Sequence, residues 1–193
     1  MNIIAISGYA RTGKDTLAEY VCEILPNAQR ISFADPLKEL VYHLYPSIGE
    51  LVDRMGWEKA KDTATQDTIG VGVRKTLQHT GETCRAILGQ DIWADTLVQR
   101  IDTVHTWVIA DLRYLNEAKK LQSLGATLVR VERPGIGPAN SHISETNLDT
   151  WTQWDVEVTN GGSLSDLRET ARHIVSVHVQ HVATSGGAHG KDI

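Results

Sequence analysis

The chain has 193 residues and a formal net charge of -5, with 41% hydrophobic and 22% charged residues. This composition is that of an ordinary globular domain and excludes a disordered or fibrous chain. The acidic balance, without any block of Lys and Arg, argues against a polymeric nucleic-acid partner, which would favour a basic face. No apolar run reaches membrane-spanning length, and a strand expected from Asn2 leaves no room for a signal peptide. We therefore expect a cytoplasmic protein without a membrane partner.

The first part of the chain predicts two strand–helix units. Asn2–Ser7 is a short apolar run typical of a buried strand, and Lys14–Leu25 has apolar residues at helical spacing. Arg30–Phe33 predicts a second strand. Pro36 is expected in the first turn of the next helix, with Asp35 as its cap.

Helices are expected in the middle of the chain, and strands alternate with helices after it. Residues 46–72 predict short helices and a mobile loop, and Pro134–Thr150 predicts a long loop. The remaining elements are strands at Thr106–Ala110, Ala126–Glu132 and Asp155–Thr159, and helices at Val73–Leu88, Asp91–Ile101, Tyr114–Leu124 and from Ser163 to about Val179.

A phosphate-binding loop is predicted at residues 8–16, between the first strand and the first helix. Two glycines with four residues between them let successive backbone N–H groups point at phosphate oxygens, and Lys14 is expected to reach the β- and γ-phosphates of ATP. The alternative is a glycine-rich turn before an ordinary helix. The candidate ATP-binding residues are Gly8, Arg11, Thr12, Gly13, Lys14, Asp15, Thr16 and, after the last strand, Asn160.

Two carboxylates are candidates for holding Mg²⁺. Asp15 replaces the Ser or Thr hydroxyl that normally ligates the ion, and it could bind Mg²⁺ directly or through the waters that the ion keeps. Thr16 can still bond a phosphate oxygen. Asp111 ends an apolar strand, where a Walker B acid would lie, and Arg113 follows within reach of a transferring phosphoryl group. A plain salt bridge between Asp111 and Arg113 is the alternative.

The alternation of elements predicts an α/β protein with a three-layer P-loop NTPase fold. We expect a five-stranded parallel sheet with helices on both faces. Ligands of such sheets bind beyond the carboxyl ends of the strands. The phosphate loop, Asp111–Arg113 and Asn160 are all predicted at that edge.

Further motifs follow the Gly-Lys-Asp-Thr ending of the loop in a fixed order. They are Phe33-Ala34-Asp35-Pro36-Leu37-Lys38, Arg74…Gln78…Gly81…Arg85, Asp111-Leu112-Arg113, Arg133-Pro134-Gly135, Ser141-His142-Ile143-Ser144-Glu145 and Thr159-Asn160-Gly161-Gly162-Ser163-Leu164. In this order and spacing, from residue 1 to about 170, the chain resembles the phage deoxynucleoside monophosphate kinases, within the P-loop nucleoside monophosphate kinases.

The resemblance implies ATP- and Mg²⁺-dependent phosphorylation of a deoxynucleoside monophosphate to the diphosphate, in the host cytoplasm if the chain is phage-encoded. It implies one kinase domain over residues 1–180, with a helical monophosphate-binding insertion at about 35–103 and a lid loop at about 133–150. Residues 181–193 are expected to form a disordered tail.

The resemblance also implies roles for particular side chains. The expected catalytic residues are Lys14, Asp111, Arg113 and Arg133. The expected acceptor-binding residues are Asp35, Lys38, Arg74, Gln78, Arg85 and Glu145. Read without the resemblance, Arg74 and Arg85 could belong to a solvated helix face, and Asn160 could be an ordinary turn residue.

Two other functions are compatible with the residues. One is a P-loop kinase for a hydroxyl acceptor, such as a nucleoside, a sugar or dephospho-coenzyme A, for which Asp35 could supply a base. The other is a non-catalytic nucleotide-binding module, although the supply of arginines exceeds what simple binding needs. A monophosphate acceptor is already largely an anion at neutral pH, so it needs no strong base. The base preference and a homodimeric state stay open.

Overall fold

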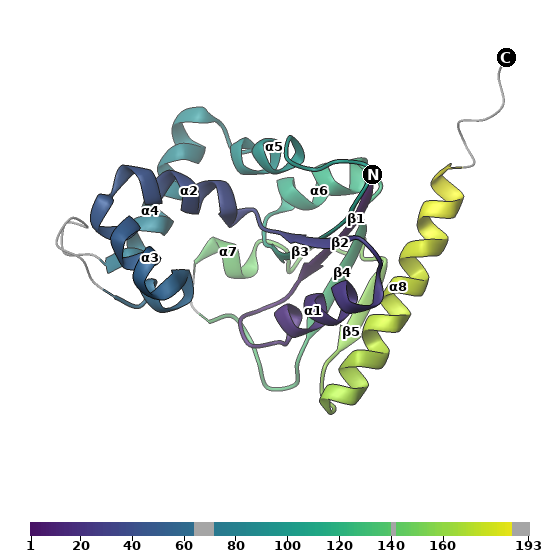
Figure 1. Ribbon diagram of the computed structural model, residues 1–193. Coiled ribbons are helices and arrows are strands. Elements are labelled where there is room, and N and C mark those ends of the chain that lie inside the picture. Colours follow the sequence, from purple (N-terminus) through teal and green to yellow (C-terminus); the bar gives the residue numbers. More distant parts are fainter. Residues whose placement is uncertain (64–71, 140–141, 187–193) are drawn as a thin grey trace, which may run out of the picture. The chain divides into compact units, whose positions relative to one another are not determined.

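The computed structural model describes residues 1–63, 72–139 and 142–186 of the chain (Figure 1). The chain divides into two compact units, one formed by Met1–Ser32 with Arg100–Ile193 and the other by Phe33–Gln99. No helix of the described residues is both long and apolar enough to cross a membrane.

The first unit is built on a parallel sheet of five strands in the order β2-β3-β1-β4-β5, as predicted. The strands are β1 (Asn2–Ser7), β2 (Ala28–Ile31), β3 (Thr106–Leu112), β4 (Thr127–Glu132) and β5 (Val156–Thr159). The helices of this unit are α1 (Lys14–Ile24), α6 (Leu115–Ser123), α7 (Ile143–Thr146) and α8 (Leu164–Gly186).

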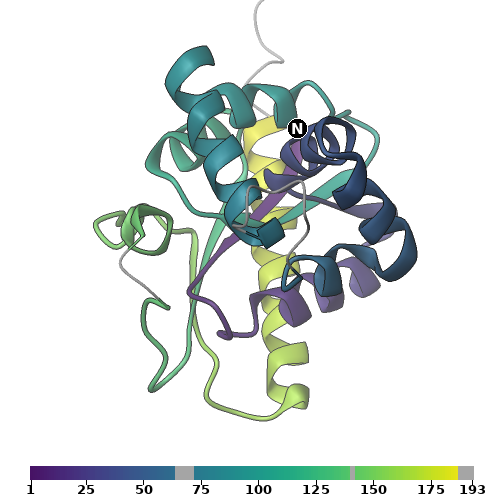
Figure 2. The same cartoon turned by 90° about the vertical axis from the view of Figure 1, so that its left-hand side faces the viewer.

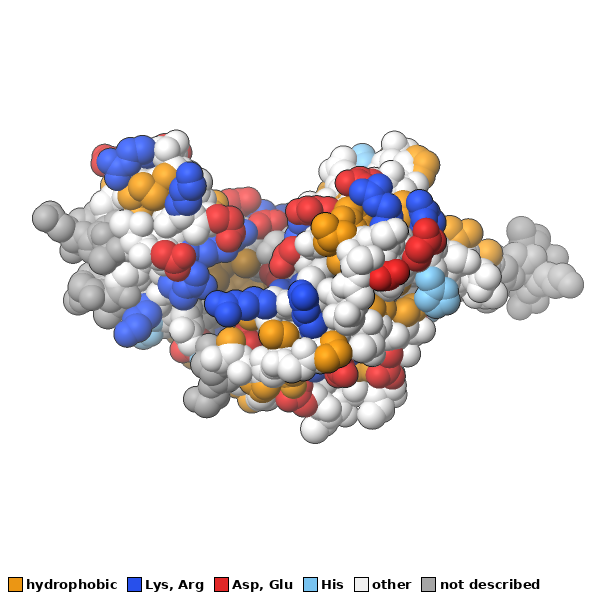
Figure 3. Space-filling model, turned by 90° about the horizontal axis from the view of Figure 1, so that it is seen from below, with side chains coloured by type: hydrophobic (Ala, Val, Ile, Leu, Met, Phe, Trp, Pro, Cys, Tyr) orange, Lys and Arg blue, Asp and Glu red, His pale blue; other side chains and the backbone are white. Residues whose placement is uncertain are grey.

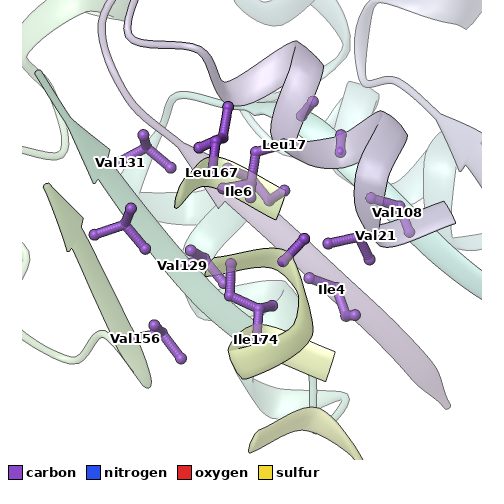
Figure 4. Close-up of a cluster of buried hydrophobic side chains, with 14 residues drawn as sticks. Ile4, Ile6, Leu17, Val21, Val108, Val129, Val131, Val156, Leu167 and Ile174 are labelled. Carbon is purple, nitrogen blue, oxygen red and sulfur yellow. The ribbon is translucent and has the colours of Figure 1, made fainter. Parts of the chain in front are cut away.

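Helices cover both faces of this sheet, which confirms the predicted three-layer α/β architecture. α1 and α8 lie side by side on one face, and α6 lies on the other (Figures 1 and 2). Ile4 and Ile6 of β1 point toward α1 and α8, into a cluster with Leu17 and Ile174 (Figure 4). Because successive strand residues face opposite sides, the buried residues Ile3, Ala5 and Ser7 of β1 lie on the α6 face.

The register of the sheet brings the carboxyl ends of four neighbouring strands together. Ser7 of β1 lies beside Leu112 of β3 on one side and beside Arg130 of β4 on the other. Glu132 of β4 pairs with Thr159 of β5. The loops that follow these strands therefore start at one edge, where the sequence places its candidate donor-binding residues.

The described elements of the second unit are all helices, α2 (Ala34–Leu44), α3 (Pro46–Ala60), α4 (Gly72–Leu88) and α5 (Ile92–Val98). They have a core of their own, made by Val41, Ile48, Leu51, Ala60 and Val73. Gly56 interrupts α3 with a positive φ of 76°, a conformation that glycine adopts without strain. The unit, Phe33–Gln99, overlaps most of the segment expected as a helical insertion at about 35–103. Its expected mobile loop falls partly on residues 64–71, outside the described residues.

The predicted starts of β2 and α2 are each two residues too late. β2 covers Ala28–Ile31 instead of Arg30–Phe33. α2 begins at Ala34 with Phe33 as its cap residue, so Asp35 lies inside the first turn instead of capping the helix. A carboxylate in a first turn is favoured by the helix dipole, which accounts for the sequence signal. The long loop predicted at Pro134–Thr150 contains the short helix α7.

The tail prediction is wrong for residues 181–186, because α8 continues to Gly186. Its buried stripe extends through Ile174 and His178, so packing on the sheet supports the helix beyond Val179. The Thr184 hydroxyl donates to the carbonyls of Gln180 and His181 within the helix. Residues 187–193 lie outside the described residues.

His178 is the buried histidine of α8, with only 3% of its surface exposed. Its Nδ1 and the Thr127 hydroxyl oxygen of β4 are 2.9 Å apart, at hydrogen-bond distance. Burial, with smaller contributions from the charges of His181 and the N-terminus, lowers the pKa of His178 to about 4. The native fold therefore holds this imidazole neutral.

We predict that His178 makes the fold sensitive to mild acid. Its folded pKa lies below its unfolded value, so the unfolded chain takes up the proton first and stability falls as pH drops from 6.5 toward 4. Between pH 7 and pH 5 this group should cost about 2 kcal/mol of unfolding free energy, measured by urea denaturation. His178→Gln should remove that part of the loss. His173→Gln, at an exposed position of the same helix, should leave the pH dependence of the unfolding free energy as in the wild type. Parallel profiles for wild type and His178→Gln would contradict the assignment.

Candidate active site

The loop between β1 and α1 requires glycine at two positions. Gly13 has a φ of 93°, and a Cβ atom there would lie 2.4 Å from the side-chain nitrogen of Asn160. Gly13 is also the cap residue of α1 and has no side chain that could accept from the helix. The first N–H groups of α1 are therefore left without a side-chain cap at the loop. The Thr12 hydroxyl donates to the Tyr9 carbonyl at 2.9 Å and closes the loop on itself.

The first glycine of the loop allows a close approach to β4. A Cβ atom on Gly8 would lie 2.4 Å from the Val131 carbonyl oxygen and 2.8 Å from the Thr12 hydroxyl oxygen. Any larger residue would push the loop away from the strand. Both glycines of the motif are therefore required by contacts with other segments, as well as by the shape of the loop.

Asn160 fastens the loop after β5 to the phosphate loop. Its side-chain amide donates to the Thr12 carbonyl at 2.8 Å, and its own N–H donates to the Glu132 carbonyl at 2.7 Å. The predicted ATP-binding residue thus lies against the predicted phosphate site, in contact with its backbone. A contact with the adenine stays a prediction.

Lys14 and Asp15 begin α1 and form part of a charge network. The Lys14 side chain is 10% exposed, and its amine lies 3.5 Å from an Asp15 carboxylate oxygen. The other Asp15 oxygen is 3.0 Å from a guanidinium nitrogen of Arg30 in β2, which also reaches Glu19 at 3.5 Å. No sequence motif marks Arg30, because only the folding of β2 beside α1 brings it to the loop.

Asp111 lies at the carboxyl end of β3, which continues to Leu112 and is longer than predicted. The Ser32 hydroxyl donates to its carboxylate at 2.6 Å and fixes its orientation. In the described part of the chain, no three His, Cys, Asp or Glu side chains gather as a metal-ligand cluster. Mg²⁺ bound with a nucleotide usually takes only one or two protein carboxylates and keeps several waters, so Asp111 and Asp15 fit this chemistry.

Arg113 and Glu145 form a close ion pair at this edge of the sheet. A guanidinium nitrogen of Arg113 lies 2.5 Å from a carboxylate oxygen of Glu145, whose side chain is 7% exposed. Burial alone would raise the pKa of Glu145, but hydrogen bonds from Arg113 and the Ala139 N–H, with the charges of Arg113 and Lys14, hold it below its ordinary value. The structure therefore brings together a cation and a carboxylate that the sequence assigned to different roles.

The segment that contains α7 is also fixed to the start of α6. The Asn147 side-chain oxygen accepts from the Leu115 N–H at 2.7 Å. Glu117 is buried and accepts from the N–H groups of Arg113 and Tyr114 at 3.1 Å. Together these bonds hold the Arg113 backbone in place beside α7.

Other candidates are exposed or lie in the second unit. Arg11, with a φ of 67°, and Arg133, which follows β4, are both exposed. In the second unit Lys38 pairs with Asp35 at 3.1 Å, and Arg74 pairs with Asp62 at 2.7 Å. Gln78 and Arg85 lie on α4 with Arg74. On the face seen in Figure 3, Lys and Arg side chains stand among acidic ones, in keeping with cations held in local ion pairs.

We predict that the close contact between Gly13 and Asn160 controls nucleotide binding. Gly13→Ala should weaken ATP binding at least about tenfold, because the new methyl meets the Asn160 amide and φ is strained. Adding Asn160→Ala should restore part of the affinity, since it removes the clash, while the strain at residue 13 and the loss of the bond to the Thr12 carbonyl remain. Isothermal titration calorimetry with ATP and Mg²⁺ measures this, with thermal melting to confirm that each variant folds. A double variant that binds no better than Gly13→Ala would contradict it.

Known proteins match the chain over most of its length. Residues 46–171 match the family model described as deoxynucleotide monophosphate kinase. A protein of Acanthamoeba polyphaga mimivirus, provisionally named a deoxynucleotide monophosphate kinase, is 30% identical over 189 residues, which cover 86% of this chain and 92% of that protein.

Two phage enzymes match over shorter stretches. The deoxynucleotide monophosphate kinase of Enterobacteria phage T4 is 31% identical over 37% of this chain and 29% of its own. That of Escherichia phage RB69 is 34% identical over 32% of this chain and 25% of its own. Among solved structures, an APS kinase of Mycobacterium tuberculosis has a TM-score of 0.45 and 11% identity over 91% of this chain and 96% of that one, a likeness too weak to support an argument. With the family model matching well over half of its residues, the chain belongs to the deoxynucleotide monophosphate kinase family.

Proposed function

We propose that the chain transfers the γ-phosphoryl group of ATP to a deoxynucleoside monophosphate, producing two diphosphates. The observation that supports this most is the convergence of polar groups at one edge of the sheet. The glycine loop follows β1, Asp111 lies near the end of β3 with Arg113 just after it, and Asn160 follows β5. Ligands of parallel α/β sheets bind at this edge. Family membership supports phosphoryl transfer as the reaction.

The donor half of the site is assigned to the loop and the residues around it. Backbone N–H groups between Gly8 and Gly13 and the start of α1 would hold the phosphates, and Lys14 would neutralise the β- and γ-phosphates. The nearly buried stem of Lys14 keeps its amine in place, so little ordering is needed when the anion binds.

Magnesium would be held by Asp111, with Asp15 contributing through bound water. The Ser32 hydroxyl orients the Asp111 carboxylate, which suits an acid that must meet a small cation in fixed geometry. Asp15 is exposed and already paired with Lys14 and Arg30, which favours an outer position for it. When bound, Mg²⁺ supplies neutralisation of charge on the transferring phosphates.

Catalysis in this proposal consists of positioning and neutralisation of charge. The second pKa of a phosphate monoester is about 6, so the acceptor is mostly dianionic at neutral pH and no side chain has to remove a proton. Arg113, held by Glu145, would face the transferring group, and Arg133 would approach it from the proposed lid at 133–150. Residues 140–141 of that lid lie outside the described residues.

In this proposal the acceptor nucleotide binds to residues of the second unit. Its charged and amide side chains can bind a phosphate and a base edge, since Lys and Arg pair with phosphate and Gln can bond a base. The proposed acceptor-binding residues are Asp35, Lys38, Arg74, Gln78 and Arg85. Two of these cations form ion pairs within the unit: Lys38 with Asp35 and Arg74 with Asp62.

The proposed function is tested by a coupled assay of ADP release with ATP and Mg²⁺. The acceptors should be the four deoxynucleoside monophosphates, the matching ribonucleotides and a set of nucleosides, each compared with ATP hydrolysis without acceptor. We expect turnover with at least one deoxynucleoside monophosphate far above that background. Turnover with nucleosides alone would favour the hydroxyl-acceptor kinase, and nucleotide binding without any turnover would favour the binding module.

We further predict that Lys14→Ala lowers kcat at least about a hundredfold, because the charge at the transferring phosphates is lost. Lys119→Ala, which removes an exposed lysine from α6, is the matched control and should keep wild-type kinetics. Circular dichroism should show that both variants are folded. Substantial activity in Lys14→Ala would mean that the loop does not bind the transferred phosphate.

A further inference from the structure

A buried guanidinium lies beneath the start of the phosphate loop. Arg130 belongs to β4 and is 7% exposed. One of its nitrogens lies 3.4 Å from the hydroxyl oxygen of Ser7, and the centre of its guanidinium lies 4.9 Å from the middle of the Tyr9 ring. Ser7 and Tyr9 are the two neighbours of Gly8, so Arg130 contacts the loop on both sides of its first glycine.

The same guanidinium reaches the segment that follows α7. A nitrogen of Arg130 lies 3.2 Å from Oδ1 of Asp149, and the Tyr9 hydroxyl donates to that same oxygen at 2.8 Å. The Asp149 backbone N–H is bonded to the Thr146 carbonyl, the last residue of α7. One carboxylate oxygen therefore joins the phosphate loop, β4 and the end of the α7 segment.

Arg130 is placed to hold protein groups, and its surroundings leave little of it for a ligand. Besides Asp149 it has Glu132 at 3.7 Å and the Trp154 ring at 6.0 Å, and it is nearly inaccessible to solvent. The next residue, Val131, supplies the carbonyl that approaches Gly8. Arg130 and Val131 of β4 therefore pack against the start of the loop at residues 7–9.

The bond from Tyr9 to Asp149 is exposed to solvent and joins a hydroxyl to a carboxylate. A hydroxyl that donates to a carboxylate makes a charge-assisted hydrogen bond, stronger than one between neutral groups. Burial and this bond raise the pKa of Tyr9, so the hydroxyl stays protonated and remains a donor at physiological pH. The two residues are 140 positions apart in the chain, so the bond joins two segments that are distant in the sequence.

We propose that Arg130, Tyr9 and Asp149 form a brace that couples the phosphate loop to the α7 segment, and that Tyr9 and Arg130 are positioning residues for the ATP phosphates. The brace orders Tyr9, hence the turn from Gly8 to Thr12, against β4. It also fixes the end of the segment that carries Glu145, the partner of Arg113. Its kinetic consequence rests on the proposed kinase function, whereas the mechanical coupling does not.

Hydrogen exchange with mass spectrometry tests the coupling without any activity. Tyr9→Phe keeps the ring over Arg130 and removes only the hydroxyl, and Asp149→Asn removes the charge of its acceptor. We expect Tyr9→Phe to speed exchange in peptides spanning residues 142–152, and Asp149→Asn to speed it in peptides spanning residues 7–13. Tyr42→Phe, which loses a similar bond to Asp53 in α3, is the matched control and should change neither. If each variant alters only its own segment, the brace is refuted.

Kinetics separate positioning from a general loss of stability. Tyr9→Phe and Asp149→Asn should each raise the Kd of ATP about fivefold and leave the KM of the acceptor within about twofold. The double variant should lose less than the sum of the two single losses, because both changes act on the bond between Tyr9 and Asp149. Additive losses, or an unchanged Kd in Tyr9→Phe, would overturn the positioning role. A wild type that binds no ATP would refute the proposed function instead, and the exchange data would still decide on the brace.

Discussion

The packing of the glycine loop between β4 and the residue after β5 is the constraint on which the rest of the site depends. Two backbone positions come so close to other segments that a single added carbon would lie 2.4 Å from the Val131 carbonyl oxygen at Gly8 and from the Asn160 amide at Gly13. A loop held at both glycines has few conformations left to lose when an anion binds. Preorganisation of this kind suits a reaction that depends on exact placement of phosphates.

Electrostatic pairing is the second organising feature of the first unit. Lys14 and Arg30 share Asp15, Arg113 pairs with Glu145, and Arg130 pairs with Asp149. Each cation is thereby kept in a defined direction before substrate arrives. This explains how a chain with a net charge of -5 can still offer a phosphate site, since local geometry outweighs the overall charge at these distances.

The motif residues could be predicted because their signal is local. The order of Gly8, Gly13 and Lys14 between a strand and a helix carries its own context, and the register of β3 then places Asp111 at the same edge. Arg30 was missed, because nothing in its neighbouring residues distinguishes a surface arginine from one that meets the loop. Glu145 was expected at the acceptor, although the structure pairs it with Arg113.

The sequence by itself determined the alternation of strands and helices, the phosphate loop and the family, since these depend on residues close together in the chain and on their order. It misjudged the end of α8, because the packing of Ile174 and His178 on the sheet supports that helix. Only the tertiary structure decided which carboxylate each cation meets. Partners such as Tyr9 and Asp149 are 140 residues apart, and it is the strand order β2-β3-β1-β4-β5 that brings their loops to one edge.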